Sequence, residues 1–160
     1  MFILFRAIVY ATLFVAFGLV FLPSWLLRNT GLTPPPVTGP AQAAGALLVI
    51  AGGCLVGWSI LTFVFVGKGT AAPFDPPRRL VVTGPFRYLR NPIYVGAVAA
   101  MAGAALYFHS WGLLAYDAAI AVTFHVVVRA YEEPVLRRSF GAEYDAYCAR
   151  VPRWLGGRKK

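Results

Sequence analysis

Residues 41–67 read AQAAGALLVIAGGCLVGWSILTFVFVG, a stretch without a charged side chain. A helix needs about 20 consecutive apolar residues to cross the hydrocarbon core of a bilayer. The stretch from Ala7 to Leu27 also lacks charge and is long enough to span. Both stretches therefore predict transmembrane helices. No clear small-residue cleavage site follows Leu22, so we expect the first stretch to stay as a span rather than act as a signal peptide.

Composition indicates the same class of protein. Hydrophobic residues make up 59% of the 160 residues and charged residues only 13%, which is too little polar surface for an ordinary small soluble domain. We predict an all-α integral membrane helix bundle that forms one domain over residues 1–160. Within its second apolar stretch, Gly53 and Gly57 form a GxxxG pattern that predicts a close helix-packing face.

The third apolar region, Asn91 to Val128, contains one charged residue, Asp117, and is too long for a single span. Polar and small residues at positions 107–112 favour a turn in its middle. We therefore predict a tight helical hairpin, whose short arms would reach only about 24–27 Å at 1.5 Å per residue. The predicted spans are then about four in number, near residues 3–27, 43–66, 93–108 and 111–128.

Lysine and arginine are distributed unevenly along the chain. Of the 15, five lie in residues 67–90, eight in residues 129–160 and none in residues 29–42. Because cytoplasmic loops carry the excess of basic residues, we expect both termini and the 67–90 loop in the cytoplasm. The net charge of +9 does not indicate a nucleic-acid partner, since these positions flank membrane segments, where topology and anionic lipid account for them.

Cysteine and histidine give no sign of a disulfide or a metal site. Cys54 lies in an apolar span and Cys148 in the tail, where the cytoplasm keeps thiols reduced. His109 and His125 are too isolated to form a recognisable zinc site. We therefore expect no bound metal.

The first polar segment is Gly84 to Gly96, GPFRYLRNPIYVG. Its prolines, with those of the loop before it, prevent a continuous helix and hold the backbone in extended and turn conformations. Arg87 and Arg90 offer forked donors suited to a carboxylate or phosphate. Tyr88 and Tyr94 add flat faces with hydroxyl tips. The segment predicts a polar, ligand-sized pocket at the membrane surface; the alternative is that the arginines bind lipid head groups and the prolines end helices.

The second polar segment, RAYEEP, covers residues 129–134. Glu132 and Glu133 point about 100° apart on an α-helix, so we expect at most one to face the pocket squarely. His125, Arg129 and Glu132 fall on one face by i, i+4, i+7 spacing. A carboxylate on that face could take an ammonium group or a ribose diol, and the alternative is ordinary pairing with a nearby arginine.

The tail, residues 137–154, reads RRSFGAEYDAYCARVPRW and alternates basic residues with aromatic ones. Tyr144 and Tyr147 are i, i+3 neighbours, as on an amphipathic helix. We expect this cytoplasmic helix to lie along the membrane surface, with most of its aromatic and arginine side chains acting as interfacial anchors.

Together these segments resemble one family. GPFRYLRNPIYVG is similar to the GPYR-x-x-RHP-x-Y-x-G segment of isoprenylcysteine carboxyl methyltransferases and related phospholipid methyltransferases. YEEPVLRRSFGAEYDAYCARVPRW is similar to their EE-x-x-L-x-x-x-FG-x-x-Y-x-x-Y-x-x-x-VPR tail. The resemblance covers roughly residues 67–154. The order and spacing of the two motifs are specific for this membrane methyltransferase superfamily and much less specific for one substrate.

The resemblance implies S-adenosylmethionine bound at the cytoplasmic face by residues 67–92 and 129–160, with a hydrophobic acceptor entering from the bilayer. If the acceptor is a carboxylate, Arg129, Arg150 or Arg153 could hold it. If it is an amine or thiol, His125 or a glutamate is the nearest base. Arg129, Glu132 and Glu133 are the expected catalytic residues. The expected cofactor residues are Tyr88, Arg90, Asn91, Pro92, Tyr94, Gly96, Glu132 and Glu133.

Two departures from the family pattern bear on mechanism. Asn91 stands where the commoner motif has histidine; asparagine keeps a hydrogen bond but cannot act as a base. Four spans are also fewer than the five or more usual among carboxyl methyltransferases of this type. We therefore expect a shorter acceptor tunnel, or one completed by a second copy in a homo-oligomer. This departure weakens the case for a prenylated protein substrate.

Two rival functions fit parts of the sequence. A membrane sterol or enone reductase that uses NADPH would also have a basic, aromatic-rich cytoplasmic tail, but such reductases have more spans. A non-enzymatic membrane scaffold would use the loop and tail only to bind anionic lipid, and it would tolerate Glu132→Gln and Glu133→Gln. The pairing of the RNP-x-Y and EEP segments favours the methyltransferase.

Overall fold

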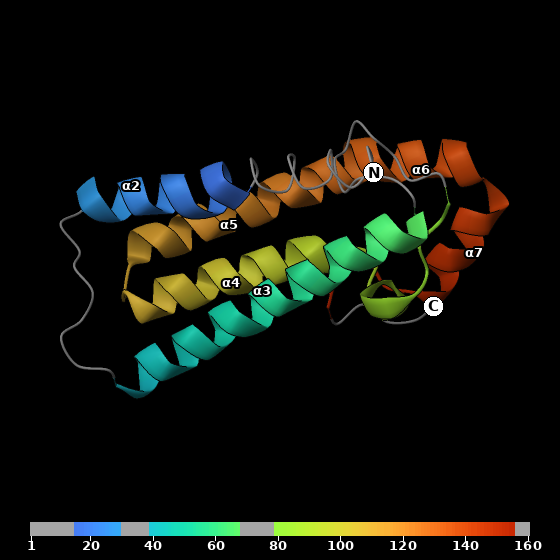
Figure 1. Ribbon diagram of the computed structural model, residues 1–160. Helices are drawn as coiled ribbons and strands as arrows, with labels where there is room; N and C mark the ends of the chain where they lie inside the picture. Colours follow the sequence, from blue (N-terminus) through green and yellow to red (C-terminus); the bar gives the residue numbers. More distant parts are fainter. Residues whose placement is uncertain (1–14, 30–38, 68–78, 156–160) are drawn as a thin grey trace.

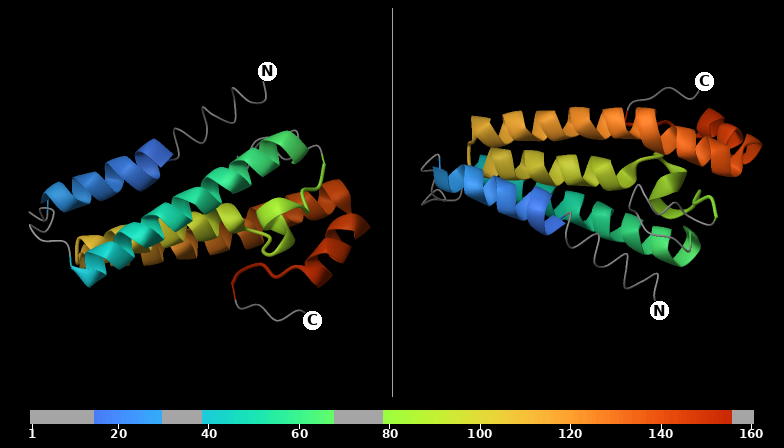
Figure 2. Two further views of the ribbon diagram at one scale, coloured as in Figure 1. Left: turned by 60° about the horizontal axis from the view of Figure 1, so that its bottom comes forward. Right: turned by 90° about the horizontal axis from the view of Figure 1, so that it is seen from above.

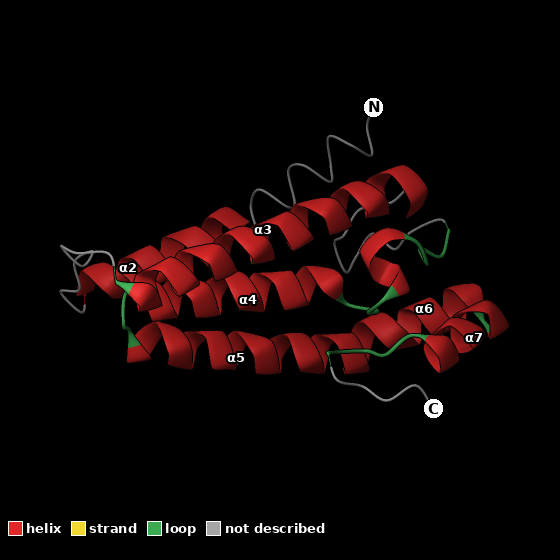
Figure 3. Ribbon diagram, turned by 90° about the horizontal axis from the view of Figure 1, so that it is seen from below, coloured by secondary structure: helices red, strands yellow, loops and turns green. Residues whose placement is uncertain are grey.

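The computed structural model of the protein describes residues 15–29, 39–67 and 79–155, and this part of the chain contains helices and loops without a strand (Figure 3). The predicted all-α class is therefore confirmed for these residues. Of the predicted first span, residues 3–14 lie outside the described residues, and so do residues 68–78 of the predicted 67–92 loop and the last five residues of the tail.

Long helices lie side by side along one direction, with α4 between α3 and α5 (Figures 1 and 2). The helix α6 continues from α5, and α7 folds back at the same end of the bundle, near the turn η2. In chain order the elements are the π-helical η1 (Val15–Phe21), α2 (Leu22–Asn29), α3 (Pro40–Gly67), the 3₁₀ turn η2 (Gly84–Arg87), α4 (Pro92–Tyr107), α5 (Trp111–Val127), the π-helical η3 (Val128–Glu132), α6 (Glu133–Phe140) and α7 (Ala142–Arg150).

Two helices of the described chain are long and apolar enough to cross a membrane, α3 and the continuous helix Trp111–Phe140. The helix predicted at 43–66 is confirmed, since α3 covers it. The arms predicted at 93–108 and 111–128 occur as the helices α4 and α5, but the second arm does not end at residue 128. It continues through η3 into α6 and ends before Gly141, with Pro134 accommodated directly after the π-helical turn η3. The number of membrane crossings stays a prediction.

The turn between α4 and α5 lies at the predicted position and is fixed by polar contacts. His109 adopts a positive φ of 49°, and the Ser110 hydroxyl caps α5 by accepting a hydrogen bond from the backbone N–H of Leu113 at 3.2 Å. The side chain of Gln42 contacts His109 Nδ1 at 3.2 Å, which ties the start of α3 to this turn. The two arms can therefore pack in antiparallel register.

Glycines bring α3 and α4 together, although they are not the glycines of the predicted packing face. A Cβ atom on Gly52 would lie 2.5 Å from the backbone oxygen of Gly96, and one on Gly45 would lie 2.7 Å from that of Gly103. The expectation for the GxxxG pair is wrong, since Cβ atoms added at residues 53 and 57 would meet nothing within 4 Å. The contact follows a seven-residue spacing, which keeps one helix face toward α4.

Two apolar clusters hold the ends of the bundle. Met101 and Ala105 of α4 pack with Leu113 of α5 and with leucines of α2. At the other end, Tyr144 and Tyr147 of α7 form a buried cluster with Val151, and leucine and phenylalanine side chains pack around it. The prediction that most tail aromatics are interfacial anchors is therefore wrong for these two tyrosines, because α7 turns its tyrosine face to the protein.

Replacing Tyr147 with phenylalanine should lower the free energy of unfolding by about 1–3 kcal/mol. The Tyr147 hydroxyl donates a 2.7 Å hydrogen bond to the backbone oxygen of Phe86, and both are buried, so the substitution leaves a buried carbonyl unpaired. Thermal unfolding in detergent would measure the change. The matched control is Tyr131→Phe on an exposed tyrosine, and equal stability of the two variants would contradict this role.

Candidate functional site

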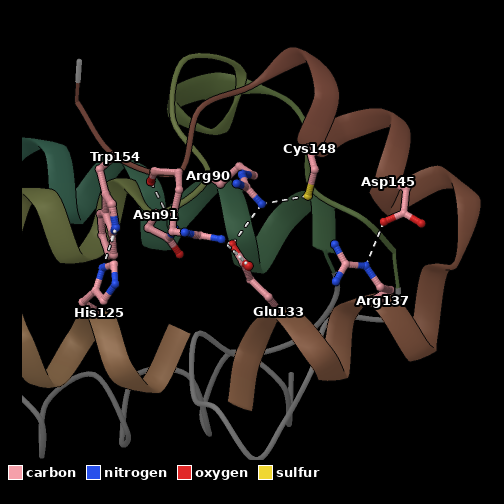
Figure 4. A network of polar contacts seen from close by, with 9 residues as sticks. Arg90, Asn91, His125, Glu133, Arg137, Asp145, Cys148 and Trp154 are labelled. Carbon is pink, nitrogen blue, oxygen red and sulfur yellow. Dashed lines mark hydrogen bonds and ion pairs between the residues drawn. The ribbon is translucent and has the colours of Figure 1, made fainter. Parts of the chain in front are cut away.

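Glu133 is the centre of a buried ion-pair network that joins the two predicted motifs (Figure 4). Its Oε1 lies 2.9 Å from Arg90 Nη1 and 2.6 Å from Arg153 Nε. Its Oε2 accepts a further hydrogen bond from Arg153 Nη2 at 2.7 Å. The side chains of Glu133 and Arg90 are only 10% and 12% exposed. One carboxylate therefore holds an arginine from the loop and an arginine from the tail.

Arg90 is positioned by its backbone N–H and by the Nη1 atom of its side chain. Its N–H donates to the oxygen of Pro152 at 2.9 Å, and its Nη1 also lies 2.7 Å from Cys148 Sγ. Its Nε is buried and has no hydrogen-bond partner within the described part of the chain. Arg90 therefore retains one buried donor that a ligand could use.

The turn η2 is held between α3 and α7, and this fixes the loop that carries Arg90. Gly84 has a positive φ of 57°, and a Cβ atom there would lie 2.9 Å from the hydroxyl of Thr62. The rings of Phe86 and Phe63 pack with centroids 5.8 Å apart. With the Tyr147 hydrogen bond on the other side, the turn is anchored to two separate elements.

Glu132 has a different partner, because its Oε1 accepts a hydrogen bond from the hydroxyl of Tyr94. Tyr94 is in the first turns of α4, and its ring packs against Phe124 of α5 with centroids 4.5 Å apart. Glu132 is half-buried, unlike its neighbour. Glu132, Tyr94 and Phe124 thus place a carboxylate, a phenol and a phenyl ring together beside the Glu133 network.

The π-helical turn η3 brings both glutamates into contact with the rest of the protein. The backbone N–H of Glu133 bonds to the oxygen of Val128, five residues earlier, which widens the helix at this point. The two glutamates have different partners, since Tyr94 approaches Glu132, whereas Arg90 and Arg153 approach Glu133. The expectation that at most one of them faces a ligand pocket stays a prediction. Of the three residues expected on one helix face, Arg129 is exposed, whereas His125 and Glu132 are half-buried.

His125 is engaged by the end of the tail. Trp154 Nε1 donates to His125 Nδ1 at 3.1 Å, and the two rings stack with centroids 6.1 Å apart. Because Nδ1 accepts this hydrogen bond, its lone pair is occupied, and the remaining ring nitrogen is left as a donor in the neutral side chain. A role for His125 as a base therefore requires that Trp154 moves.

The other predicted site residues lie around this network rather than in it. Tyr88 and Arg150 are exposed, and the Nε of Arg150 donates to the oxygen of Ala146 in its own helix. Pro92 is buried at the first position of α4. Gly96 faces α3, where its own Cβ would lie 2.7 Å from the backbone oxygen of Gly52, so its contacts are those of helix packing.

Electrostatics at the tail favour a charged Arg153 beside neutral phenols. The hydrogen bonds to Glu133 raise the pKa of Arg153, so the guanidinium remains charged. Burial raises the pKa of Tyr144 and of Tyr147, so both phenols stay protonated at all ordinary pH values. The tyrosine hydroxyls therefore act as fixed hydrogen-bond donors and not as acids.

Sequence reasoning missed three residues of the site, Phe124, Cys148 and Trp154. Cys148 follows the buried Tyr144 by four residues, so helical spacing alone could have placed it on the inner face of α7. Phe124 lies in an apolar run in which no pattern distinguishes a ring that faces the site from one that faces lipid. The stacking of Trp154 on His125 joins residues 29 positions apart, which no local signal predicts.

Within the described residues, these observations define a helical protein with two helices long and apolar enough to cross a membrane and with a buried polar network that joins two motifs distant in sequence. Residues 40–143 match the family model described as phospholipid methyltransferase. The match covers more than half of the chain, which belongs to this family, and membership implies methyltransferase activity and association with a membrane. No curated protein and no solved structure matches the chain.

Proposed function

We propose that the protein transfers a methyl group from S-adenosylmethionine to a small molecule partitioned in the membrane. The observation that carries the proposal is the junction of the two motifs at one end of the bundle. Glu133 pairs with Arg90 across 43 residues of sequence, and Glu132 bonds to Tyr94 across 38. A local function of either motif, such as lipid anchoring, does not require these contacts.

The residues at this junction fit the polar groups of S-adenosylmethionine. The unpartnered Nε of Arg90 is a donor for a carboxylate. The Glu132 carboxylate would accept hydrogen bonds from an ammonium group or a ribose diol, and Tyr94 with Phe124 would offer ring surfaces to the adenine or the sulfonium. The bound cofactor would supply a methyl group already activated on a sulfonium sulfur. Asn91 and Pro92 would line the same site from the start of α4.

The protein's own contribution would be alignment and exclusion of water. The buried pairing of Glu133 with two arginines holds the loop, α6 and the tail in fixed relation. We further propose that the spans cross the bilayer with both termini and this network in the cytoplasm, so that the acceptor approaches from lipid. The acceptor could be an isoprenylcysteine-type carboxylate, a lipid or another hydrophobic molecule.

The residues proposed to hold the acceptor differ in their exposure and in the side-chain contacts that they already make. The Arg153 side chain is already paired with Glu133, and His125 Nδ1 already accepts a hydrogen bond from Trp154. Arg129 and Arg150 are exposed. An acceptor carboxylate would therefore meet Arg129 or Arg150 more readily than Arg153. If the acceptor is an amine, a base must take its proton. Of the two glutamates at the proposed cofactor site, only the half-buried Glu132 is not already paired with an arginine.

Calorimetric titration of detergent-purified protein with S-adenosylhomocysteine, and separately with NADPH, tests the proposal. We expect saturable binding of the first ligand alone. Glu132→Gln and Tyr94→Phe should each weaken it by about 10- to 100-fold, because a hydrogen bond to a charged group is lost. The matched controls are Glu143→Gln and Tyr131→Phe, on exposed residues, and these should bind like the native protein.

Other results would reject the methyltransferase in different ways. Binding of NADPH alone would indicate the reductase. Binding of neither ligand would indicate a membrane scaffold. Equal affinity of Glu132→Gln, Tyr94→Phe and their controls for S-adenosylhomocysteine would mean that the ligand binds elsewhere in the protein.

A further inference from the structure

The C-terminal segment Val151–Trp154 is tied to three other parts of the protein, although it is not helical. The backbone N–H of Arg90 donates to the oxygen of Pro152, and Asn91 Nδ2 donates to the oxygen of Arg153 at 3.2 Å. The Arg153 side chain pairs with Glu133, and Trp154 bonds to His125. The segment thus connects the start of α4 with the α5–α6 helix (Figure 4).

Asn91 stands at the N-cap of α4 but does not cap it. An N-cap asparagine ordinarily accepts a hydrogen bond from a backbone N–H in the first turn of the helix, whereas this side chain makes no such bond. Asn91 is only 9% exposed, and its side-chain Nδ2 donates to the carbonyl oxygen of Arg153. The carboxamide is therefore used by the tail and not by its own helix.

We propose that Asn91 is a positioning residue, whose side-chain N–H holds the carbonyl of Arg153 and keeps the segment Val151–Trp154 closed over the cofactor site. The part that concerns the cofactor rests on the proposed function. The position requires a hydrogen-bond donor and not a base. This accounts for asparagine where the commoner motif has histidine, because a carboxamide and an imidazole both offer an N–H, and only the imidazole titrates near neutral pH.

Limited trypsin digestion tests the closure without reference to any ligand. Trypsin cuts after arginine, and Arg153 can enter a protease only when it leaves Glu133. In full-length, detergent-purified protein we expect Asn91→Ala to raise the rate of cutting after Arg153 about fivefold. This is the change in the open population that the loss of one typical hydrogen bond produces. Asn91→Asp should raise it at least as much, because a carboxylate cannot donate. Asn91→His, or Asn91→Gln if histidine does not fit, should restore the native rate.

The matched control is Asn29→Ala. The Nδ2 of Asn29 also donates to a backbone oxygen, that of Trp25, at 3.0 Å, but Asn29 ends α2 and lies outside the network. Its removal should leave cutting after Arg153 unchanged. Native cutting rates in Asn91→Ala, or a rate raised equally in Asn29→Ala, would overturn the proposal.

The second measurement is the dissociation rate of S-adenosylhomocysteine over pH 6 to 9. We expect the dissociation rate to rise about fivefold in Asn91→Ala and to return to the native value in Asn91→His above about pH 7.5, where the imidazole is neutral. Dissociation as fast in both Asn91→His and Asn91→Gln as in Asn91→Ala would overturn the proposal, since a hydrogen-bond donor at this position would then not hold the segment. If the native protein does not bind this ligand, the proposed function fails, and the digestion experiment still decides the role of Asn91.

Discussion

Glu133→Ala is expected to lower the free energy of unfolding by about 3–5 kcal/mol and to abolish ligand binding. Removing one partner of a buried ion pair leaves the other charge without compensation, and here two arginines lose the same carboxylate. Arg90 is almost fully buried and cannot turn to water without moving the loop. Unfolding in detergent, followed by circular dichroism against temperature, would measure the loss.

Two variants separate charge from size. Glu133→Gln keeps the shape of the side chain and should still lose most of the stability, because the guanidinium groups remain unneutralised. Asp145→Asn breaks the ion pair with Arg137, in which both side chains are more than half exposed, and it should leave the unfolding temperature unchanged. If Glu133→Gln were as stable as Asp145→Asn, the network would not hold the tail in place.

The second large effect is expected at Gly52, where alanine should destabilise the protein by about 2–3 kcal/mol despite its better helix propensity. The added Cβ would lie 2.5 Å from the backbone oxygen of Gly96 and 2.6 Å from the backbone nitrogen of Ala100. Backbone atoms cannot rotate away, so α3 and α4 must separate along their contact. Unfolding in a titration with a denaturing detergent would measure the change.

The neighbouring glycine provides the control. A Cβ atom on Gly53 meets nothing within 4 Å, so Gly53→Ala should be neutral or stabilising by up to about 1 kcal/mol, the helix-propensity gain. The two substitutions are chemically identical and one residue apart. Equal effects would contradict the close contact of α3 with α4.

Local sequence patterns predicted where the helices lie, but they did not predict which helix faces pack against the rest of the protein. Uncharged length located α3, and the polar residues around His109 located the turn between α4 and α5. The glycines were misassigned because, apart from Gln42 near its start, every side chain of α3 is small or apolar, so no polar stripe marks which face meets protein and which faces lipid. The tail aromatics were misassigned for a related reason, since amphipathic spacing does not tell whether the apolar face meets a membrane or a neighbouring helix.

At the site, motif comparison identified the residues, and folding determined how they are paired. Arg90, Glu132, Glu133 and Tyr94 were all expected, but their sorting into two pairs depends on the π-helical turn η3, for which the sequence gives no signal. Arg153 was expected to hold the acceptor and instead neutralises Glu133. Whether these residues bind S-adenosylmethionine stays a prediction that the titration above can decide.

The glycine contacts between α3 and α4 also have a mechanical consequence. Helices normally meet through a layer of side chains, which can change rotamer and allow the helices to slide. At Gly45 and Gly52 this layer is absent, and the two backbones touch. We therefore expect α3 and α4 to move together as one rigid body. An opening wide enough for a lipid chain would have to form at another helix boundary, where side chains can rearrange.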